Sequence, residues 1–367
     1  MLTMASESVL RDPRLEPTRE LTTCDDARST SPTNAYARDF TIDVFKGYFT
    51  ILMILGHLLA FIRISAGHEV AAVLLAHNHL VIFPGLLFAF GFSCYHAYFS
   101  RQFSAVRRRM LITTGKCLVA YYLCGCVYYV VMDSPHLSWG GLLQIATFSR
   151  LPVFAEFLLA YLLFIGIGLL AFPVVVWLLE QRPVFLLACL LSLLMTAFPY
   201  WLIHSPRLGI IVGMDTIATF PIAQYAIYFL LGLYFARYRI NWHPTVTVVA
   251  MLATSVTLAD YILTREIPTR FPPSFEWLLA PALLIYIYYL LSRKTAANPW
   301  LLRILQAFGR NVLFYLVMSN LAIFIFHLLY PQAQQTLWQA VGLMLALFSG
   351  ITVLLFIARP LAVQQRT

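Results

Sequence analysis

The sequence predicts an all-α, polytopic membrane protein with about ten transmembrane helices. Of its 367 residues, 60% are hydrophobic and only 11% are charged, which is more apolar surface than a soluble core can hide. A membrane-crossing helix needs about 20 mostly apolar residues. Ten such segments follow one another along the chain, at residues 44–64, 79–99, 111–131, 151–171, 184–203, 219–237, 245–263, 275–291, 308–329 and 337–358.

The distribution of basic residues predicts the orientation of these spans. With the N-terminus in the cytoplasm, fourteen Lys and Arg residues after the first span fall on the inner side and five on the outer side. Short cytoplasmic loops retain Lys and Arg, so we expect both termini in the cytoplasm and a multi-pass location in a bacterial inner (plasma) membrane. The net charge of +9 then reflects this bias and contact with membrane lipid, not nucleic acid.

The chain is predicted to form one transmembrane domain with two polar tails. Residues 1–40 mix both charge signs and contain no apolar core of a signal peptide, so we expect a disordered cytoplasmic tail there. The transmembrane domain spans residues 41–360, and a second cytoplasmic tail spans 361–367. Five of the six cysteines fall inside predicted spans, which argues against a disulfide framework and a zinc site, and no metal is expected.

The first span carries the most informative pair of residues. Lys46 and His57 stand eleven residues apart in an otherwise apolar stretch. That is about three helical turns, so both side chains project from one face, about 16 Å apart along the axis. Ionisable groups within the hydrocarbon region usually mark a reaction or transport path, although a hydrogen-bonded packing histidine is the plainer alternative for His57.

Several motifs occur in a recognisable order. They are IDVFKGYFTILMILGH at 42–57, FPGLLFAFGFSCYHAYF at 83–99, TFPIAQYAIYFLLGLYFARY at 219–238, RFPPSFEWLL at 270–279 and FGRNVLFYLVMSN at 308–320. From Arg38 to Arg359 the chain resembles the acyltransferase 3 family of integral membrane acyltransferases. Lys46 and His57 match that family's opening pattern of a basic residue, ten others and a histidine. Val312 replaces a serine of the family's pattern, and no second catalytic histidine is assigned.

This resemblance implies an enzyme, an O-acetyltransferase or related acyltransferase of exopolysaccharide biosynthesis. It would move an acyl group, expected to be acetyl, from acyl-CoA to a hydroxyl of a cell-surface sugar. The acceptor includes lipid-linked forms, and partner proteins of polysaccharide biosynthesis are expected. Acetyl-CoA is the donor substrate.

Two residues are the predicted catalytic groups. His57 is expected to accept the hydroxyl proton as a general base or, alternatively, to carry the acyl group itself. Glu156, about five residues into the fourth predicted span, is expected to orient His57, position the acceptor or carry away a proton. An interfacial charge near Arg150 is the plainer alternative for Glu156.

Binding residues are predicted on both sides of the membrane. A cytoplasmic donor would present phosphates to charge-assisted donors, although the positive-inside rule alone also explains a basic loop. The predicted donor-binding residues are Lys46, Arg107, Arg108, Arg109 and Lys116. The last four form a basic cluster. In the corresponding cluster of the family two arginines are often separated by two residues, whereas here three arginines are consecutive. The predicted acceptor-binding residues are Arg150, Arg270 and Asn320.

Two further interpretations belong to different classes of function or site. A proton-coupled transporter or flippase would use Lys46, His57 and Glu156 as a substrate or proton path, with no covalent chemistry. A cluster of His68, Glu69, His77 and His79 is interpreted as a solvated outer loop or a rim of the acceptor site between the first two spans, because nothing in its spacing enforces the tetrahedral geometry of a metal site.

Overall fold

The computed structural model of the chain describes residues 40–61, 63–66, 68–132, 138–330 and 334–364. The predicted tail at residues 1–40 therefore lies outside the described residues except for Phe40. Helices make up nearly all of the described chain, together with one pair of short parallel strands. The elements in order are α1 (Thr41–Phe61), β1 (Arg63–Ala66), α2 (His68–Cys94), η1 (Tyr95–Phe99), α3 (Phe103–Met132), α4 (Trp139–Ala146), α5 (Glu156–Leu170), α6 (Phe172–Glu180), α7 (Arg182–Leu194), η3 (Met195–Ala197), η4 (Tyr200–Leu202), α8 (Pro206–Val212), α9 (Ile222–Tyr238), α10 (Pro244–Thr264), α11 (Phe275–Leu279), α12 (Ala282–Ala296), α13 (Pro299–Arg310), α14 (Val312–Leu329), β2 (Gln334–Thr336) and α15 (Leu337–Gln364).

The helices have the length and composition of an integral membrane protein. Seven stretches of the described chain are long and apolar enough to cross a membrane, and the bent pair α5–α6 brings the number to eight. Each of the ten predicted spans overlaps a helix, although α7 and α9 are shorter than the seven. The all-α prediction is confirmed at this level.

Among the boundaries that differ from the sequence prediction are those of α2, α5 and α15. Helix α2 begins at His68, eleven residues before the predicted span at 79–99. The predicted span at 151–171 begins as a helix only at Glu156 and turns by 86° into α6, whose first turn contains Pro173; proline lacks the N–H that would continue the ladder of the preceding helix. The predicted last tail begins inside α15, which continues to Gln364.

Two pairs of glycines allow helices to cross at backbone contact. A Cβ atom on Gly47 would lie 2.3 Å from the Leu305 carbonyl oxygen, and one on Gly309 would lie 1.7 Å from the Asp43 carbonyl oxygen. Helix α13 is thereby fixed against the start of α1. Gly91 and Gly232 similarly join α2 to α9, which positions the first two helices against the rest of the bundle.

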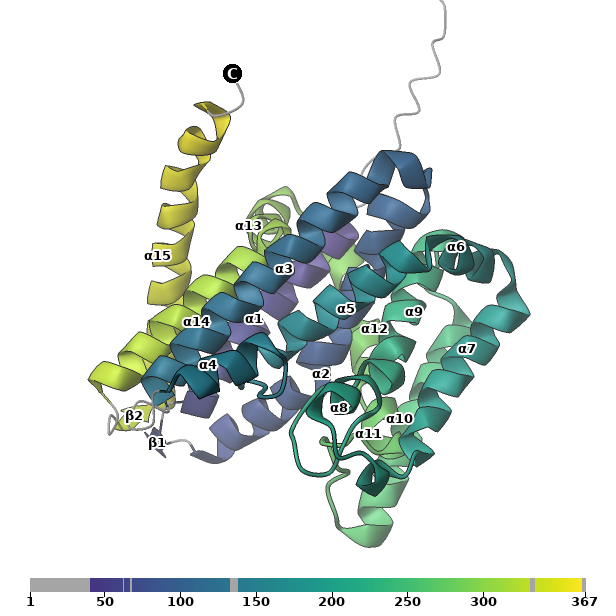
Figure 1. The fold of residues 1–367 in the computed structure, drawn as a ribbon, viewed down its shortest axis with the longest axis horizontal. Helices are drawn as coiled ribbons and strands as arrows, with labels where there is room; N and C mark the ends of the chain where they lie inside the picture. Colours follow the sequence, from purple (N-terminus) through teal and green to yellow (C-terminus); the bar gives the residue numbers. More distant parts are fainter. Residues whose placement is uncertain (1–39, 62, 67, 133–137, 331–333, 365–367) are drawn as a thin grey trace, which may run out of the picture. The chain divides into compact units, whose positions relative to one another are not determined.

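The short elements gather at the two ends of the bundle. Figure 1 shows the β1–β2 pair, α4 and α8 at one end of the long helices, and α6 and α13 at the other. The predicted orientation assigns the first of these ends to the outer face. Most of the candidate site described next is built at that end.

Candidate functional site

A cavity of about 270 Å³ lies between the second half of α1, the middle of α2 and the start of α5. The segment before α9 and the loop before α11 complete its wall. Most of the residues that line the cavity are apolar, and five of them are phenylalanines. The polar side chains that line it are His57, Asn78, His79, Glu156 and Arg270.

A hydrogen bond to Asn320 of α14 sets the protonation pattern of His57. The Asn320 Nδ2 atom donates to the Phe154 carbonyl oxygen at 3.3 Å, and a carbonyl can only accept, so the amide oxygen of Asn320 faces the other way. That oxygen lies 2.7 Å from His57 Nδ1. Nδ1 therefore carries a proton and donates it, so in the neutral imidazole Nε2 is the acceptor.

Phe154 holds the other side of the imidazole. Its backbone has a positive φ of 66°, a conformation that non-glycine residues rarely adopt and that costs about 1–2 kcal/mol. Its ring packs edge-on against His57 with 4.6 Å between centroids and also contacts Phe61. The strained residue thus supplies both the carbonyl that orients Asn320 and the ring that packs against His57.

Glu156 lies in the first turn of α5, where the helix dipole favours a negative charge. It lines the same cavity as His57, and its Oε2 atom is buried without a hydrogen-bond partner. In the described part of the chain no hydrogen bond joins Glu156 to His57, so the expectation that Glu156 orients His57 is wrong. The imidazole is oriented by Asn320 instead. The carboxylate oxygen therefore remains available to a ligand.

Arg270 reaches the cavity from the loop between α10 and α11. Its guanidinium carbon lies 5.2 Å from the Phe220 ring centroid and 4.6 Å from that of Phe271. Burial lowers the pKa of this guanidinium, yet arginine remains protonated in proteins. The Nε atom is buried without a partner, so the cavity contains a cation with an unused donor.

Asn78 is a lining residue that the sequence prediction missed. Its side chain is 1% exposed, and neither Oδ1 nor Nδ2 has a hydrogen-bond partner. It packs against Gly56, the residue before His57, where an added Cβ atom would lie 3.2 Å from Nδ2. A polar asparagine inside an apolar helix would have indicated a site residue, but the sequence prediction placed residue 78 in a loop outside the second span.

That predicted outer loop is wrong, because residues 68–94 form α2. His77 points away from the cavity and shares a 3.0 Å hydrogen bond with Tyr288 of α12, whereas His79 lines the cavity. Among the described residues, no group of three or more His, Cys, Asp or Glu could hold a metal ion.

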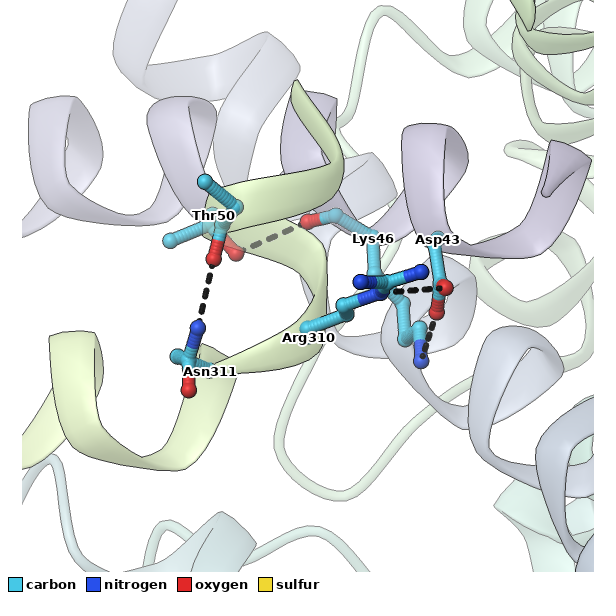
Figure 2. Close-up of polar contacts among 6 residues, drawn as sticks. Asp43, Lys46, Thr50, Arg310 and Asn311 are labelled. Atoms are coloured by element: carbon cyan, nitrogen blue, oxygen red, sulfur yellow. Dashed lines mark hydrogen bonds and ion pairs between the residues drawn. The ribbon is translucent and has the colours of Figure 1, made fainter. Parts of the chain in front are cut away.

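Lys46 lies in a separate polar cluster at the start of α1. Its Nζ atom is 3.0 Å from Asp43 Oδ1, and Arg310 Nε of α13 is 3.4 Å from Asp43 Oδ2. Figure 2 shows both cations against the one carboxylate. Nearby, the Thr50 hydroxyl donates to the Lys46 carbonyl oxygen at 2.8 Å, and Asn311 Nδ2 donates to the Ala307 carbonyl oxygen at 2.8 Å. Because two cations share one anion, the cluster keeps a net positive charge.

The other predicted binding residues lie outside the cavity lining. Arg107, Arg108 and Arg109 are exposed on the first turns of α3, and Lys116 is exposed farther along it. The guanidinium of Arg109 lies 5.9 Å from the Tyr98 ring centroid, and that of Arg150 lies 4.8 Å from the Tyr129 ring centroid. The structure therefore brings together His57, Glu156 and Arg270, and Asn320 is hydrogen-bonded to the histidine. Arg150 and the predicted donor-binding residues lie apart from this group.

Comparison with protein-family models, with curated proteins and with solved structures finds no match to this chain.

Proposed function

We propose that this protein is a membrane acyltransferase that moves an acyl group, taken to be acetyl, from acyl-CoA to a hydroxyl of a cell-surface sugar. The observation that carries the proposal is the His57 imidazole, whose Nδ1 proton is committed to Asn320 while the ring lines a cavity with a carboxylate and a cation. An imidazole held in this tautomer has the geometry of a general base. The order of motifs resembling the acyltransferase 3 family supplies the reaction class.

In the proposed reaction the sugar hydroxyl attacks the thioester carbonyl carbon. His57 Nε2 takes the hydroxyl proton as the new C–O bond forms, and it returns that proton to the sulfur as the C–S bond breaks. The products are an ester and the free thiol of coenzyme A, so protons and electrons balance. The Asn78 Nδ2 donor stands in the same cavity and would stabilise the transient oxyanion.

The donor is proposed to approach from the cytoplasmic side. The net positive cluster of Lys46, Asp43 and Arg310 at the start of α1 and the exposed arginines that begin α3 are suited to the phosphates of coenzyme A. Lys46 precedes His57 by eleven residues of continuous helix, which separates them by about 16 Å. An extended thioester arm would bridge that interval.

The proposed topology has ten spans with both termini in the cytoplasm of a bacterial cell. It rests on the excess of Lys and Arg in the loops assigned to the inner side of the membrane and on the overlap of each predicted span with a helix. In this orientation the cavity belongs to the outer half of the protein, where a glycan acceptor, including a lipid-linked one, would enter.

The test compares ester content of surface glycan in cells that carry the native chain or His57→Ala at equal membrane abundance. The proposal predicts loss of the esters, since a general base contributes about 10²- to 10⁴-fold in rate. Equal ester content would refute it. A transporter that used the same residues would instead change the amount of exported glycan while leaving the number of esters per sugar unaltered.

A second measurement separates direct transfer from an acyl carrier role of His57. Protein incubated with acetyl-labelled acetyl-CoA and no acceptor is quenched and separated from free label. Direct transfer, which we propose, leaves the protein unlabelled; an acyl-imidazole intermediate would place label on the peptide that contains His57.

A further inference from the structure

The guanidinium of Arg270 packs against two aromatic rings that contact one another at a ring-centroid distance of 5.1 Å, so both rings lie on the same side of it. The rings of Phe220 and Phe271 lie 5.2 and 4.6 Å from its central carbon. Aromatic faces attract a cation electrostatically but accept none of its in-plane hydrogen bonds well. The N–H groups of the guanidinium are therefore left to bind a ligand.

No carboxylate of the described residues forms an ion pair with Arg270. Glu156 lines the same cavity, but the ion pairs found are those of Asp43 with Lys46 and Arg310. The Arg270 Nε atom is buried and has no acceptor. Arg270 as a whole is half-buried and is attracted by the charge of Glu156, so what it lacks is an acceptor for the buried Nε–H. An unpaired buried donor is destabilising, and an anionic ligand would supply that acceptor.

The loop that carries Arg270 is anchored just after this residue. Trp277 Nε1 donates to the Tyr225 hydroxyl at 3.1 Å, and the Tyr200 hydroxyl donates to the Pro273 carbonyl at 3.3 Å. Tyr225 also packs edge-on against the Phe220 ring. The cation is thus held in place before any ligand arrives, which limits the ordering that binding requires.

From these contacts we infer that the acceptor sugar carries a carboxylate, which binds the edge of Arg270 while a neighbouring hydroxyl is presented to His57. This inference rests on the proposed function and adds the chemical class of the acceptor. A planar carboxylate matches the guanidinium edge with two parallel hydrogen bonds. The unpartnered Oδ1 atom of Asn78 would accept a hydrogen bond from a sugar hydroxyl.

A carboxylate fits this cavity better than a phosphate monoester. Arg270 and Glu156 contribute one positive and one negative charge to the lining. A phosphate monoester carries about −1.5 to −2 charges at pH 7, so Arg270 alone would not neutralise it and Glu156 would repel the excess. A uronic acid carries a single negative charge, which Arg270 offsets.

The test measures thermal unfolding of the purified full-length protein in detergent with four added probes. They are sodium glucuronate, its uncharged methyl ester, glucose and glucose 6-phosphate at equal concentration and ionic strength. We expect glucuronate alone to raise the unfolding midpoint, by about 2 °C or more once the site is nearly saturated. An equal rise with the methyl ester, a rise only with glucose 6-phosphate, or no rise with any probe would overturn the inference.

Two variants localise the effect. Arg270→Gln is expected to lose the response to glucuronate, whereas Arg265→Gln, an exposed arginine of the same loop, is expected to keep it. A response to glucuronate that survives in Arg270→Gln would contradict the inference. If Arg270→Gln does not fold, the comparison of glucuronate with its methyl ester in the unaltered protein still tests the inference.

No step of this assay involves acyl transfer. The binding assay can therefore fail while the His57 ester test succeeds, and the His57 ester test can fail while the binding assay succeeds.

Discussion

The Nδ1 atom of His57 and the Oδ1 atom of Asn320 lie 2.7 Å apart, although 263 residues separate them in the sequence. This bond joins α1 to α14 inside the bundle. Because Asn320 is itself oriented by the Phe154 carbonyl, three distant segments determine which nitrogen of His57 accepts a proton. Asn320 is therefore a positioning residue in our proposal, in addition to its predicted proximity to the acceptor.

Replacement of Asn320 by Ala is expected to slow acyl transfer by about tenfold, the rate equivalent of one ordinary hydrogen bond. Asn320→Asp keeps an acceptor for the Nδ1 proton and should retain more activity than the alanine variant. The matched control is Ser319→Ala, since the Ser319 hydroxyl bonds only its own helix. Ester content per unit of protein is the measurement, and unchanged activity in Asn320→Ala would contradict the positioning role.

Asn78→Leu is expected to raise stability while it lowers transfer. Both polar atoms of Asn78 are buried without partners, so replacing them with apolar atoms of similar volume removes a desolvation penalty of about 1–3 kcal/mol. The same change removes groups that would contact the acceptor. Thermal unfolding and ester content are measured on the same preparations.

Gln224→Leu is the contrasting variant for that prediction. The Gln224 Nε2 atom donates to the carbonyl oxygens of Met195 and Val212, so its loss should destabilise the protein. If Asn78→Leu destabilised the protein as much as Gln224→Leu, Asn78 would have partners in the folded protein and its role in the site would be withdrawn.

Asp43→Ala is expected to destabilise the protein by about 1.5–3 kcal/mol, the usual contribution of hydrogen bonds to charged groups. The Asp43 side chain is 3% exposed and binds both Lys46 and Arg310, so its removal leaves two neighbouring cations without their shared anion. Asp215→Ala, at an exposed carboxylate, is the control. A melting temperature of Asp43→Ala equal to that of the control would show that the cluster does not join α1 to α13.

Gly309→Ala is expected to destabilise the contact between α13 and α1. The added Cβ atom would lie 1.7 Å from the Asp43 carbonyl oxygen, so backbones must separate, with a penalty of about 1–3 kcal/mol. Gly350→Ala is the control, because nothing lies within 4 Å of its added Cβ atom and alanine favours a helix. Opposite shifts in the unfolding midpoint are predicted; equal shifts would contradict the close crossing.

The sequence predicts the helices well because hydropathy and helix length are local properties. It also selects three residues that line one cavity, His57, Glu156 and Arg270, since ionisable groups in or beside apolar spans are few. The start of α2 was misplaced because the polar residues between His68 and His79 lower the local hydropathy. That error removed Asn78 from consideration.

The hydrogen bonds and ion pairs that join residues far apart in the chain cannot be predicted from one sequence. Asn320 pairs with His57, and Asp43 pairs with Arg310 across 267 residues. Such pairs depend on how the helices cross, which the close approach at Gly47 and Gly309 determines. The left-handed backbone of Phe154 also has no local signal, because phenylalanine does not favour it.

The most direct test of the central claim uses purified protein in lipid vesicles, acetyl-labelled acetyl-CoA and the cell's own surface glycan stripped of esters by mild alkali. The account predicts that the native chain transfers label to the glycan, that mild alkali releases it, and that His57→Ala transfers at least about 100-fold less. Equal labelling by His57→Ala, or movement of glycan across the vesicle with no label attached, would contradict it.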